Sequence, residues 1–428
     1  MKVNELKEKL NNGEFNEQIK YIYACGDDKA EYYSGRFTEV IKGFEETFER
    51  TPDDMRLFSA PGRTEIGGNH TDHQHGCVLA AGLNLDVIGA VALNGKDEIR
   101  IKSKGYPMDV ILLDELEPSE EEQDRACALI RGVVSKIVSM GYKVQGFDAY
   151  TLSSVLKGSG MSSSAAFEVL VGTIINGLFC NNEIDPIEIA KIAQYAENVY
   201  FGKPCGLLDQ MACSVGGFVS IDFEDTNKPV INKTDFDFAS SGHSLCIVDT
   251  KGSHSDLTDD YAAVRSEMED VASFFGKKVL RECTKADVLK NAGAIKEKFN
   301  ERAVIRALHY YGENERVVKQ ADALSKGDFE TFKSLIIESG RSSYMYNQNV
   351  YTCKKPTNQP LSLALAVSEE ILSGKGAWRV HGGGFAGTIQ AFVPDSSVEE
   401  YTSALKSIFG DDSCYVLSVR PFGGISLA

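Results

Sequence analysis

A run of small residues at positions 157–166 carries the most suggestive chemistry of the sequence. Gly158 and Gly160 allow a backbone to approach a ligand closely, and Ser162–Ser164 offer three hydroxyl groups. The apolar stretch Ala165–Phe179 follows, and its length favours a buried helix, whose first N–H groups and dipole attract an anion. The run therefore predicts a phosphate-binding loop whose serines could also reach a magnesium ion.

The same residue types also occur in ordinary turns. Glycine and serine favour turns and helix caps, so a serine-rich cap with structural glycines is an alternative to a phosphate site. The chain contains no G-x-x-x-x-G-K-[ST] pattern, which argues against a P-loop kinase. The candidate phosphate-binding residues are Gly158, Ser159, Gly160, Met161, Ser162, Ser163 and Ser164.

A second polar cluster, residues 63–75, lies between two apolar runs. Its three histidines and Asp72 suggest a zinc site, but their spacing matches neither H-E-x-x-H nor a zinc-finger pattern. Binding of a polyol fits better, because a sugar needs several fixed hydrogen-bond donors and acceptors on one loop. The candidates for this role are Arg63, Asn69, His70 and Asp72.

Two acidic residues stand in unusual surroundings. Asp209 lies in the small and apolar segment Cys205–Cys213, where a carboxylate is costly unless it is paired or functional. Glu197 lies in the last turns of the predicted helix Pro186–Tyr200, where the helix dipole disfavours a negative charge. A nearby cation would explain Glu197, although a solvated surface glutamate is the alternative.

Near the C-terminus, Gly382, Gly384 and Gly387 match the pattern G-x-G-x-x-G. A dinucleotide-binding fingerprint must open a helix, whereas Thr388–Val393 alternates like a strand. A nicotinamide enzyme is therefore disfavoured. The pattern predicts a tight hairpin between two strands, whose backbone could pack against a ligand or only against another loop.

The elements that position these residues follow from hydrophobic periodicity. Strands are expected at Val78–Leu93, within Ile99–Ile111, and at Phe147–Val155, Gly217–Phe223 and Leu245–Asp249. Helices are expected within residues 1–56, at Ala126–Met140, and over most of 258–375. Leu57–Arg63 is expected to be a turn because of its Pro-Gly pair, and Asp225–Lys233 is the most linker-like part of the middle.

Length and composition limit the possible functions. The 428 residues, 43% of them hydrophobic, suffice for two domains. A net charge of −17 disfavours nucleic acid and anionic membranes as partners, because both require a basic surface. No signal peptide or 18-residue apolar stretch is apparent, and ten cysteines without C-x-x-C pairs are typical of reduced thiols in a cytoplasmic enzyme.

The order of these motifs resembles the galactokinases, members of the galactokinase, homoserine kinase, mevalonate kinase and phosphomevalonate kinase superfamily. The matching segments are Ala60–Arg63 with His70–Asp72, then Gly158–Ala166, then Gly206–Gln210, and finally Gly382–Gly387. The resemblance runs from about Phe58 to the C-terminus. It implies a two-domain α+β small-molecule kinase fold with the active site in the cleft between domains, and ATP-dependent phosphorylation of the anomeric hydroxyl of galactose.

The resemblance also implies a role for each candidate. Asp209 would face the reacting hydroxyl with Arg63 beside it, and Arg63 would keep the pKa of Asp209 low. Ser164 and Glu197 would hold Mg²⁺, while Gly158–Ser163 would surround the phosphates of ATP. The residues that would contact the sugar are His70, Asp72, Gly206 and Tyr261, with Asn69 at the position that reads the sixth carbon.

Two departures from the family pattern concern the sugar. Galactokinases usually have a glutamate at the position of Asn69 and a tyrosine or phenylalanine at the position of His73. Because asparagine lacks the charge of that glutamate, we expect greater tolerance of changes at the sixth carbon of the sugar, including a carboxylate there. The alternatives are a kinase for a related uronic acid, 6-deoxy sugar or pentose, and a non-catalytic sugar sensor, which the retained Asp209, Ser164 and Glu197 disfavour.

Three segments are expected along the chain. Residues 1–56 form a helical N-terminal extension, 57–235 an α+β domain with the sugar motif, the phosphate loop and Asp209, and 236–428 an α+β domain with the glycine-rich hairpin. The expected partners are a sugar and ATP, without nucleic acid or membrane. A monomer is expected.

Overall fold

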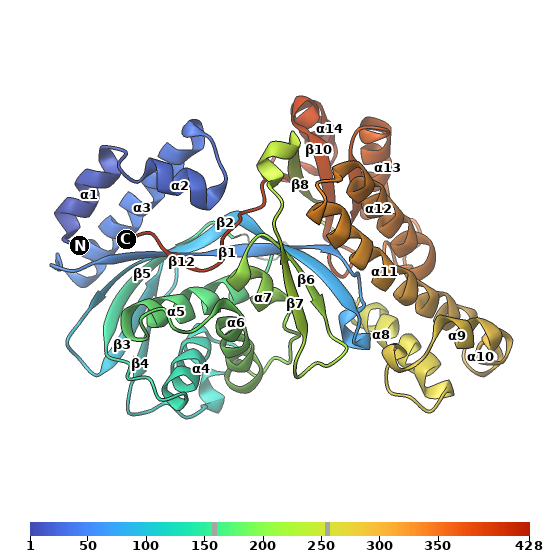
Figure 1. Cartoon of the computed structure of the whole chain (residues 1–428), viewed down its shortest axis with the longest axis horizontal. Helices are drawn as coiled ribbons and strands as arrows, with labels where there is room; N and C mark the ends of the chain where they lie inside the picture. Colours follow the sequence, from blue (N-terminus) through green and yellow to red (C-terminus); the bar gives the residue numbers. More distant parts are fainter. Residues whose placement is uncertain (156–160, 253–256) are drawn as a thin grey trace. The chain divides into compact units, whose positions relative to one another are not determined.

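The computed structural model describes residues 1–155, 161–252 and 257–428, and it forms two compact units (Figure 1). The first contains Met1–Arg63, Gly82–Gly217 and Val419–Ala428, and the second contains Thr64–Ala81 and Phe218–Ser418. This division differs from the expected one. The boundary after the middle segment falls at Gly217 rather than near 235, residues 64–81 belong to the second unit, and the last ten residues return to the first.

A mixed sheet organises the first unit, with strands in the order β12-β1-β2-β5-β3-β4. β2 and β5 are antiparallel, β5 and β3 are parallel, and β3 and β4 form a hairpin. The strands are β1 Arg56–Gly67, β2 Cys77–Leu93, β3 Glu98–Ser103, β4 Met108–Leu112, β5 Phe147–Ser153 and β12 Ile425–Ser426. The strand predictions for residues 78–93, 99–111 and 147–155 are therefore confirmed, with small differences at the ends.

Helices cover both faces of this sheet (Figure 1). Ile88, Ala90 and Ala92 of β2 pack in one core with the three N-terminal helices. The opposite face is covered by α5, because a side chain at Gly89 would contact Leu170 of that helix. The helices are α1 Val3–Asn11, α2 Asn16–Tyr23, α3 Asp27–Phe48, α4 Ala126–Ser139, α5 Ser163–Phe179, α6 Pro186–Tyr195 and α7 Leu208–Val215. Alternation along β2 thus gives each helical layer its own apolar surface.

A buried charge cluster ties the N-terminal helices to the sheet. Asp86 of β2 is fully buried and accepts hydrogen bonds from Arg36 of α3, at 2.5 Å, and from Tyr23 of α2. Arg420, near the C-terminus, lies 3.3 Å from the same carboxylate. Burial alone would raise the pKa of Asp86, but the two arginines offset that effect and the pKa is lowered. Asp86 therefore remains charged and joins three distant parts of the sequence.

The second unit contains a four-stranded antiparallel sheet in the order β11-β8-β10-β9. A separate hairpin of β6 and β7 pairs with Cys77–Ala81 of β2. The strands are β6 Phe218–Asp222, β7 Val230–Thr234, β8 His243–Asp249, β9 Ala377–Val380, β10 Thr388–Pro394 and β11 Cys414–Leu417. The helices are α8 Thr258–Phe274, α9 Lys285–Lys290, α10 Ala292–Lys298, α11 Glu301–Ser325, α12 Phe329–Ser342, α13 Pro360–Leu372 and α14 Val398–Phe409. The predicted strands at 217–223 and 245–249 and the helical region are confirmed.

Two expectations are wrong. Leu57–Arg63 is not a turn but part of β1, because Leu57, Phe58 and Ala60 are buried and strand burial outweighs the local turn signal. Pro61 is tolerated there since the ladder to β12 involves Phe58 and Ser59 and ends before it. Residues 225–233 are likewise not a linker, because the β6–β7 hairpin occupies this segment.

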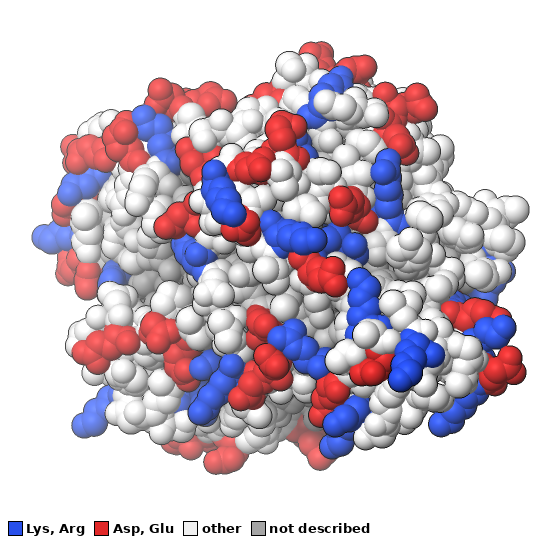
Figure 2. Space-filling view, turned by 45° about the vertical axis from the view of Figure 1, so that its right-hand side comes forward, with Lys and Arg blue, Asp and Glu red and all other residues white. Residues whose placement is uncertain are grey.

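The surface matches the acidic composition. Figure 2 shows Lys and Arg side chains interspersed with Asp and Glu over the displayed face, without one large basic area. Of the helices in the described ranges, none is long and apolar enough to cross a membrane.

Candidate active site

Arg63 and Asp209, which lie 146 positions apart in the sequence, form a two-pronged ion pair in the first unit. Arg63 Nε donates to Asp209 Oδ1 at 2.7 Å, and Arg63 Nη2 donates to Oδ2 at 2.5 Å. Arg63 lies on β1, and Asp209 lies in the first turn of α7, where the helix dipole favours a carboxylate. This fork fixes the plane of the carboxylate as well as its charge.

The Asp209 carboxylate is kept ionised by its partners. Burial raises its pKa, but the Arg63 guanidinium and the Ser162 hydroxyl favour the charged form and lower the pKa below its usual value. Ser162 Oγ donates to Asp209 Oδ2 at 2.7 Å. The prediction that Arg63 lies beside Asp209 and keeps its pKa low is thus confirmed.

Met161 and Ser162, which belong to the predicted phosphate-binding loop at 157–166, lie next to this pair. The Arg63 backbone N–H donates to the carbonyl of Met161, and Ser162 adopts a left-handed backbone conformation with φ of 53°. α5 begins at Ser163, two residues before the expected Ala165, so Ser163 and Ser164 form its first turn. The remaining predicted phosphate residues, Gly158, Ser159 and Gly160, lie outside the described residues.

Glu197 belongs to a buried polar cluster. It lies in a π-helical segment, Ala196–Phe201, that continues α6, and its Oε2 accepts from Gln210 Nε2 at 2.6 Å. Lys203 Nζ lies 3.5 Å from Glu197 Oε1, and Glu197 is buried, so of the two alternatives the structure favours a nearby cation over a solvated surface glutamate. A π-turn is a frequent feature of functional sites, because it shifts one side chain out of regular helical register.

Glu168 is a member of this cluster that sequence reasoning missed. It is fully buried on α5, and Gln210 Nε2 also donates to its Oε2, at 3.2 Å. Burial and the nearby Glu197 charge raise the pKa of Glu168 well above its usual value. An acidic residue within an otherwise apolar helix, four positions after Ser164, was the signal that could have identified it.

These residues suit a magnesium ion. Mg²⁺ prefers carboxylate and hydroxyl oxygens, which Ser164, Glu197 and Glu168 carry. Glu168 Oε1 is buried and has no hydrogen-bonding partner within the part of the chain that the structure describes. An unsatisfied buried oxygen is costly, and a cation close to it would remove that cost.

In the second unit, three of the predicted sugar residues, Asn69, His70 and Tyr261, contact the glycine-rich turn, whereas Gly206 belongs to the first unit. β9 and β10 pair on either side of residues 382–387, which confirms the predicted hairpin. The carbonyl of Gly383 accepts from His70 Nε2 at 2.9 Å, and the carbonyl of Gly384 accepts from the Tyr261 hydroxyl at 2.8 Å. His70 and Tyr261, which were expected to contact a sugar, thus both pack against this turn and direct their polar groups at its backbone carbonyls.

Asn69 differs from the expectation that it contacts the sugar. It is fully buried, and its amide nitrogen donates to Glu65 Oε1 at 3.1 Å and to the Gly382 carbonyl at 2.7 Å. Its amide oxygen accepts from Asn349 Nδ2 at 2.8 Å and from the Ser343 hydroxyl at 3.2 Å. Two donated and two accepted bonds are the full capacity of a primary amide, and protein groups use all of them.

The histidines near Asn69 do not form a metal site. His73 is half-buried, and desolvation by its surroundings lowers its pKa to about 3. His75 follows the short helix Asp72–Gln74 with φ of 57°. Within residues 1–155, 161–252 and 257–428, no three His, Cys, Asp or Glu side chains are grouped to hold a metal. The structure therefore gives the zinc interpretation no support.

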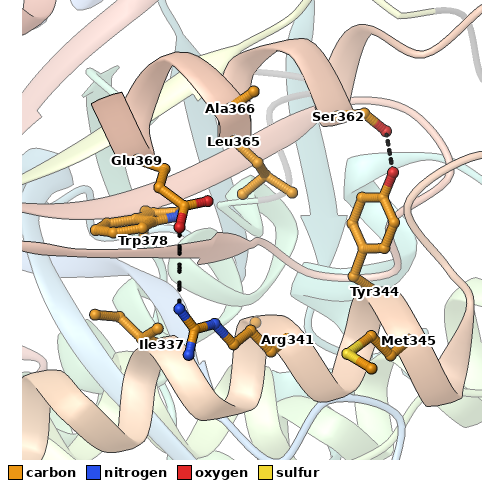
Figure 3. A pocket seen from close by; sticks show the side chains of 10 residues that line it. Ile337, Arg341, Tyr344, Met345, Ser362, Leu365, Ala366, Glu369 and Trp378 are labelled. Atoms are coloured by element: carbon orange, nitrogen blue, oxygen red, sulfur yellow. Dashed lines mark hydrogen bonds and ion pairs between the residues drawn. The ribbon is translucent and has the colours of Figure 1, made fainter. Parts of the chain in front are cut away.

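Figure 3 shows a pocket of about 300 Å³ in the second unit, between α12 and α13. Arg341 and Glu369 point toward one another across it as an ion pair of 3.9 Å, and the hydroxyls of Tyr344 and Ser362 are 3.4 Å apart. Trp378 of β9 also lines it. Its lining includes none of the predicted site residues, so it has no part in the site described above.

Comparison with known proteins agrees with the motifs. Residues 42–93 match the family model described as the galactokinase galactose-binding signature, and residues 128–217 match the GHMP kinases N-terminal domain. The chain is 31% identical over 357 residues to a galactokinase of Actinobacillus pleuropneumoniae serotype 3, covering 82% of this chain and 88% of that relative. The chain belongs to the galactokinase family. A Streptomyces coelicolor galactokinase is 29% identical over 375 residues, covering 86% of this chain and 92% of that protein.

Solved structures show the family fold. A crystal structure of Lactococcus lactis galactokinase complexed with galactose has a TM-score of 0.75 at 22% identity, covering 91% of this chain and 99% of that one. Methanococcus jannaschii mevalonate kinase has a TM-score of 0.60 at 15% identity, covering 86% of this chain and 98% of its own. The α+β fold expected from the galactokinase resemblance is therefore confirmed, and the structure adds that it is built on two sheets.

Proposed function

We propose that this protein transfers the γ-phosphoryl group of ATP to the anomeric hydroxyl of galactose, giving galactose 1-phosphate and ADP. The observation that carries the proposal is the forked Arg63–Asp209 pair in a member of the galactokinase family. An ionised carboxylate held rigidly at a helix start is suited to receive a hydroxyl proton. The named galactokinase relatives support galactose as the sugar.

In this mechanism the anomeric oxygen of the sugar forms a bond to the γ-phosphorus of ATP, and the bond between that phosphorus and the leaving ADP oxygen breaks. Asp209 accepts the proton that the anomeric hydroxyl loses. Phosphoryl transfer passes through a loose transition state, so catalysis depends on position and on neutralisation of charge. Arg63 holds Asp209 in place and adds a positive charge beside it in a strongly acidic chain. Whether the proton moves early or late does not alter these roles.

The nucleotide is assigned to the N-terminus of α5. Ser163 and Ser164 lie in its first turn, and the N-terminal dipole of a 17-residue helix favours a phosphate there. Gly158–Ser163 are proposed to surround the phosphates, and Ser164 and Glu197 to hold Mg²⁺, with Glu168 beside them. When bound, the ion would neutralise charge on the phosphate oxygens.

For the sugar, we propose His70, Asp72, Gly206 and Tyr261 as contacts, in agreement with the family motifs. Asn69 instead of the usual glutamate supports a second candidate, a kinase for a related sugar altered at the sixth carbon. However, the Glu65 carboxylate lies 3.1 Å from the Asn69 amide, so the exchange does not leave this neighbourhood uncharged. Galactose therefore remains the first choice.

A cytoplasmic location is part of the proposal. ATP is available there, and all ten cysteines, which lie within the described ranges, are free thiols, as expected in a reducing compartment.

The test is release of ADP with Mg-ATP and a panel of galactose, galacturonate, 6-deoxygalactose and pentoses. We expect galactose to be the best substrate. Asp209→Asn should lower kcat by about 10²- to 10⁴-fold, the usual contribution of positioned proton transfer, while calorimetry shows ATP binding within about twofold of wild type. Turnover of none of these sugars would refute the kinase assignment, and a loss below tenfold in Asp209→Asn would refute the role of Asp209.

A further inference from the structure

Glu65 is a carboxylate of the second unit whose role the family motifs leave open. It lies on β1 within the segment that matches the galactose-binding signature, four positions before Asn69. Its side chain retains 16% of its surface exposed, whereas its partners Asn69 and Arg379 are fully buried. Glu65 is therefore the part of this trio that solvent or a ligand can reach.

The Glu65 carboxylate is held from two directions. Arg379 Nη2 of β9 donates to Oε1 at 2.9 Å, and Asn69 Nδ2 donates to the same oxygen at 3.1 Å. The Glu65 backbone carbonyl also accepts from Gln390 Nε2 of β10 at 3.2 Å. A side chain fixed by buried partners on two strands and one loop loses little entropy when it binds a ligand, and this is what specific recognition requires.

The carboxylate still has capacity for a ligand. An ionised carboxylate offers about four acceptor positions, and Oε1 receives both bonds described above. Asn69 is in the opposite situation, because its amide is saturated and fully buried. Of these two neighbouring side chains, Glu65 is the one suited to accept a hydrogen bond from a hydroxyl.

We infer that Glu65, rather than Asn69, supplies the carboxylate that accepts a hydrogen bond from a sugar hydroxyl in this protein. Asn69 is then a positioning residue, which joins Glu65 to the glycine-rich turn through the Gly382 carbonyl. The inference rests on the proposed function, because it assigns a residue to the sugar of that reaction. It further predicts that galacturonate is a poor substrate, since a carboxylate remains in the site.

The experiment measures kcat/KM of the wild type and of Glu65→Gln with galactose and with its 2-, 3-, 4- and 6-deoxy analogues. In the wild type, removal of the hydroxyl that Glu65 binds should lower kcat/KM by about 10- to 100-fold, the usual cost of losing a hydrogen bond to a charged group. Glu65→Gln should show a similar loss with galactose but little further loss with that one analogue. Calorimetric galactose binding without ATP should weaken by a similar factor.

Two further variants separate recognition from a structural role. Glu65→Gln leaves buried Arg379 without its anion, so the double variant Glu65→Gln/Arg379→Met removes that unpaired charge and should regain thermal stability. Galactose affinity should stay low in the double variant. Asn69→Ser removes the amide without adding charge. Because Asn69 acts through Glu65, this variant should lower kcat/KM for galactose in the wild type but add little further loss in the Glu65→Gln background.

The outcomes are distinct. If Glu65→Gln lowers kcat/KM equally for all five sugars, or if the double variant regains galactose affinity, Glu65 is only the counterion of Arg379 and the inference fails. It also fails if Asn69→Ser lowers kcat/KM for galactose by the same factor in the Glu65→Gln background as in the wild type. In either case wild-type turnover of galactose leaves the proposed function standing. Failure of the wild type with galactose and every other sugar of the panel would overturn both.

Discussion

Replacement of Arg63 by methionine should move the acid limb of the pH–rate profile to higher pH. Burial raises the pKa of Asp209, and the Arg63 guanidinium is the main influence that opposes it. Methionine keeps the length and apolar stem of the side chain but removes the charge. Asp209 would then become protonated at higher pH, and a protonated carboxyl cannot accept the proton of the sugar hydroxyl.

The size of the shift follows from the geometry of the pair. An adjacent arginine typically lowers the pKa of an aspartate by about 1–3 units. Two bonds of 2.5 and 2.7 Å suggest the upper part of this range, but 35% of the Asp209 side chain is exposed, so solvent screens the interaction. We expect a rise of about 1–2 units, each equivalent to about 1.4 kcal/mol between the two protonation states.

The measurement is kcat/KM for galactose from pH 4.5 to 8, which reports ionisation of the free enzyme. The wild type should stay level over this range, because its Asp209 pKa lies below the usual value of about 3.9. Arg63→Met should lose rate toward the acid end of this range, in addition to a lower plateau. Thermal unfolding at each pH would show that both proteins remain folded.

Two control variants make the result specific. Arg63→Lys keeps the charge but loses the forked geometry, so its plateau should fall while its acid limb stays low. Ser162→Ala removes the 2.7 Å hydrogen bond to Asp209 and should shift the limb by less than 1 unit. If Arg63→Met lowers the rate equally at every pH, Arg63 does not control the ionisation of Asp209, and the reasoning is refuted.

Three further predictions concern the metal and stability. Ser164→Ala and Glu197→Gln should each raise the Mg²⁺ concentration for half-maximal rate about tenfold or more, and unchanged Mg²⁺ titrations of both variants would exclude a metal role. Asp86→Asn should lower the free energy of unfolding by about 3–5 kcal/mol in urea titrations, because two buried arginines lose their anion; a loss below 1 kcal/mol would contradict this. Burial lowers the pKa of His309 to about 4, so as the pH falls the unfolded chain binds a proton at this histidine before the folded protein does, and the free energy of unfolding should decrease between pH 6.5 and 4. His309→Gln should remove about 3 kcal/mol of this pH dependence. An unaltered pH dependence in His309→Gln would count against a buried neutral His309.

Features set by local patterns could be predicted from the sequence. Alternating apolar residues identified the strands around Val78–Leu93 and Phe147–Val155, and the apolar run after the serines identified α5. The hairpin at 382–387 followed from its glycines, since Gly382, Gly384 and Gly387 all have positive φ. Periodicity and turn chemistry act over a few neighbouring residues, so they are visible without a fold. The failure at Leu57–Arg63 has the converse cause, because burial of Leu57 and Phe58 decided a conformation that Pro61 and Gly62 alone would not favour.

Assignment of the pairings depended on the tertiary structure. The family motifs placed Arg63 beside Asp209, but the forked geometry of the pair appears only in the fold. Glu65 and Arg379 lie 314 positions apart, and no local pattern in the sequence indicates that they form an ion pair. Asn69 looked like a sugar ligand because its residue type can donate and accept, whereas the fold buries it and uses every bond it can make. The physical reason is that a sequence shows the hydrogen-bonding capacity of a side chain, but only long-range packing decides which partners use that capacity and what remains for a ligand.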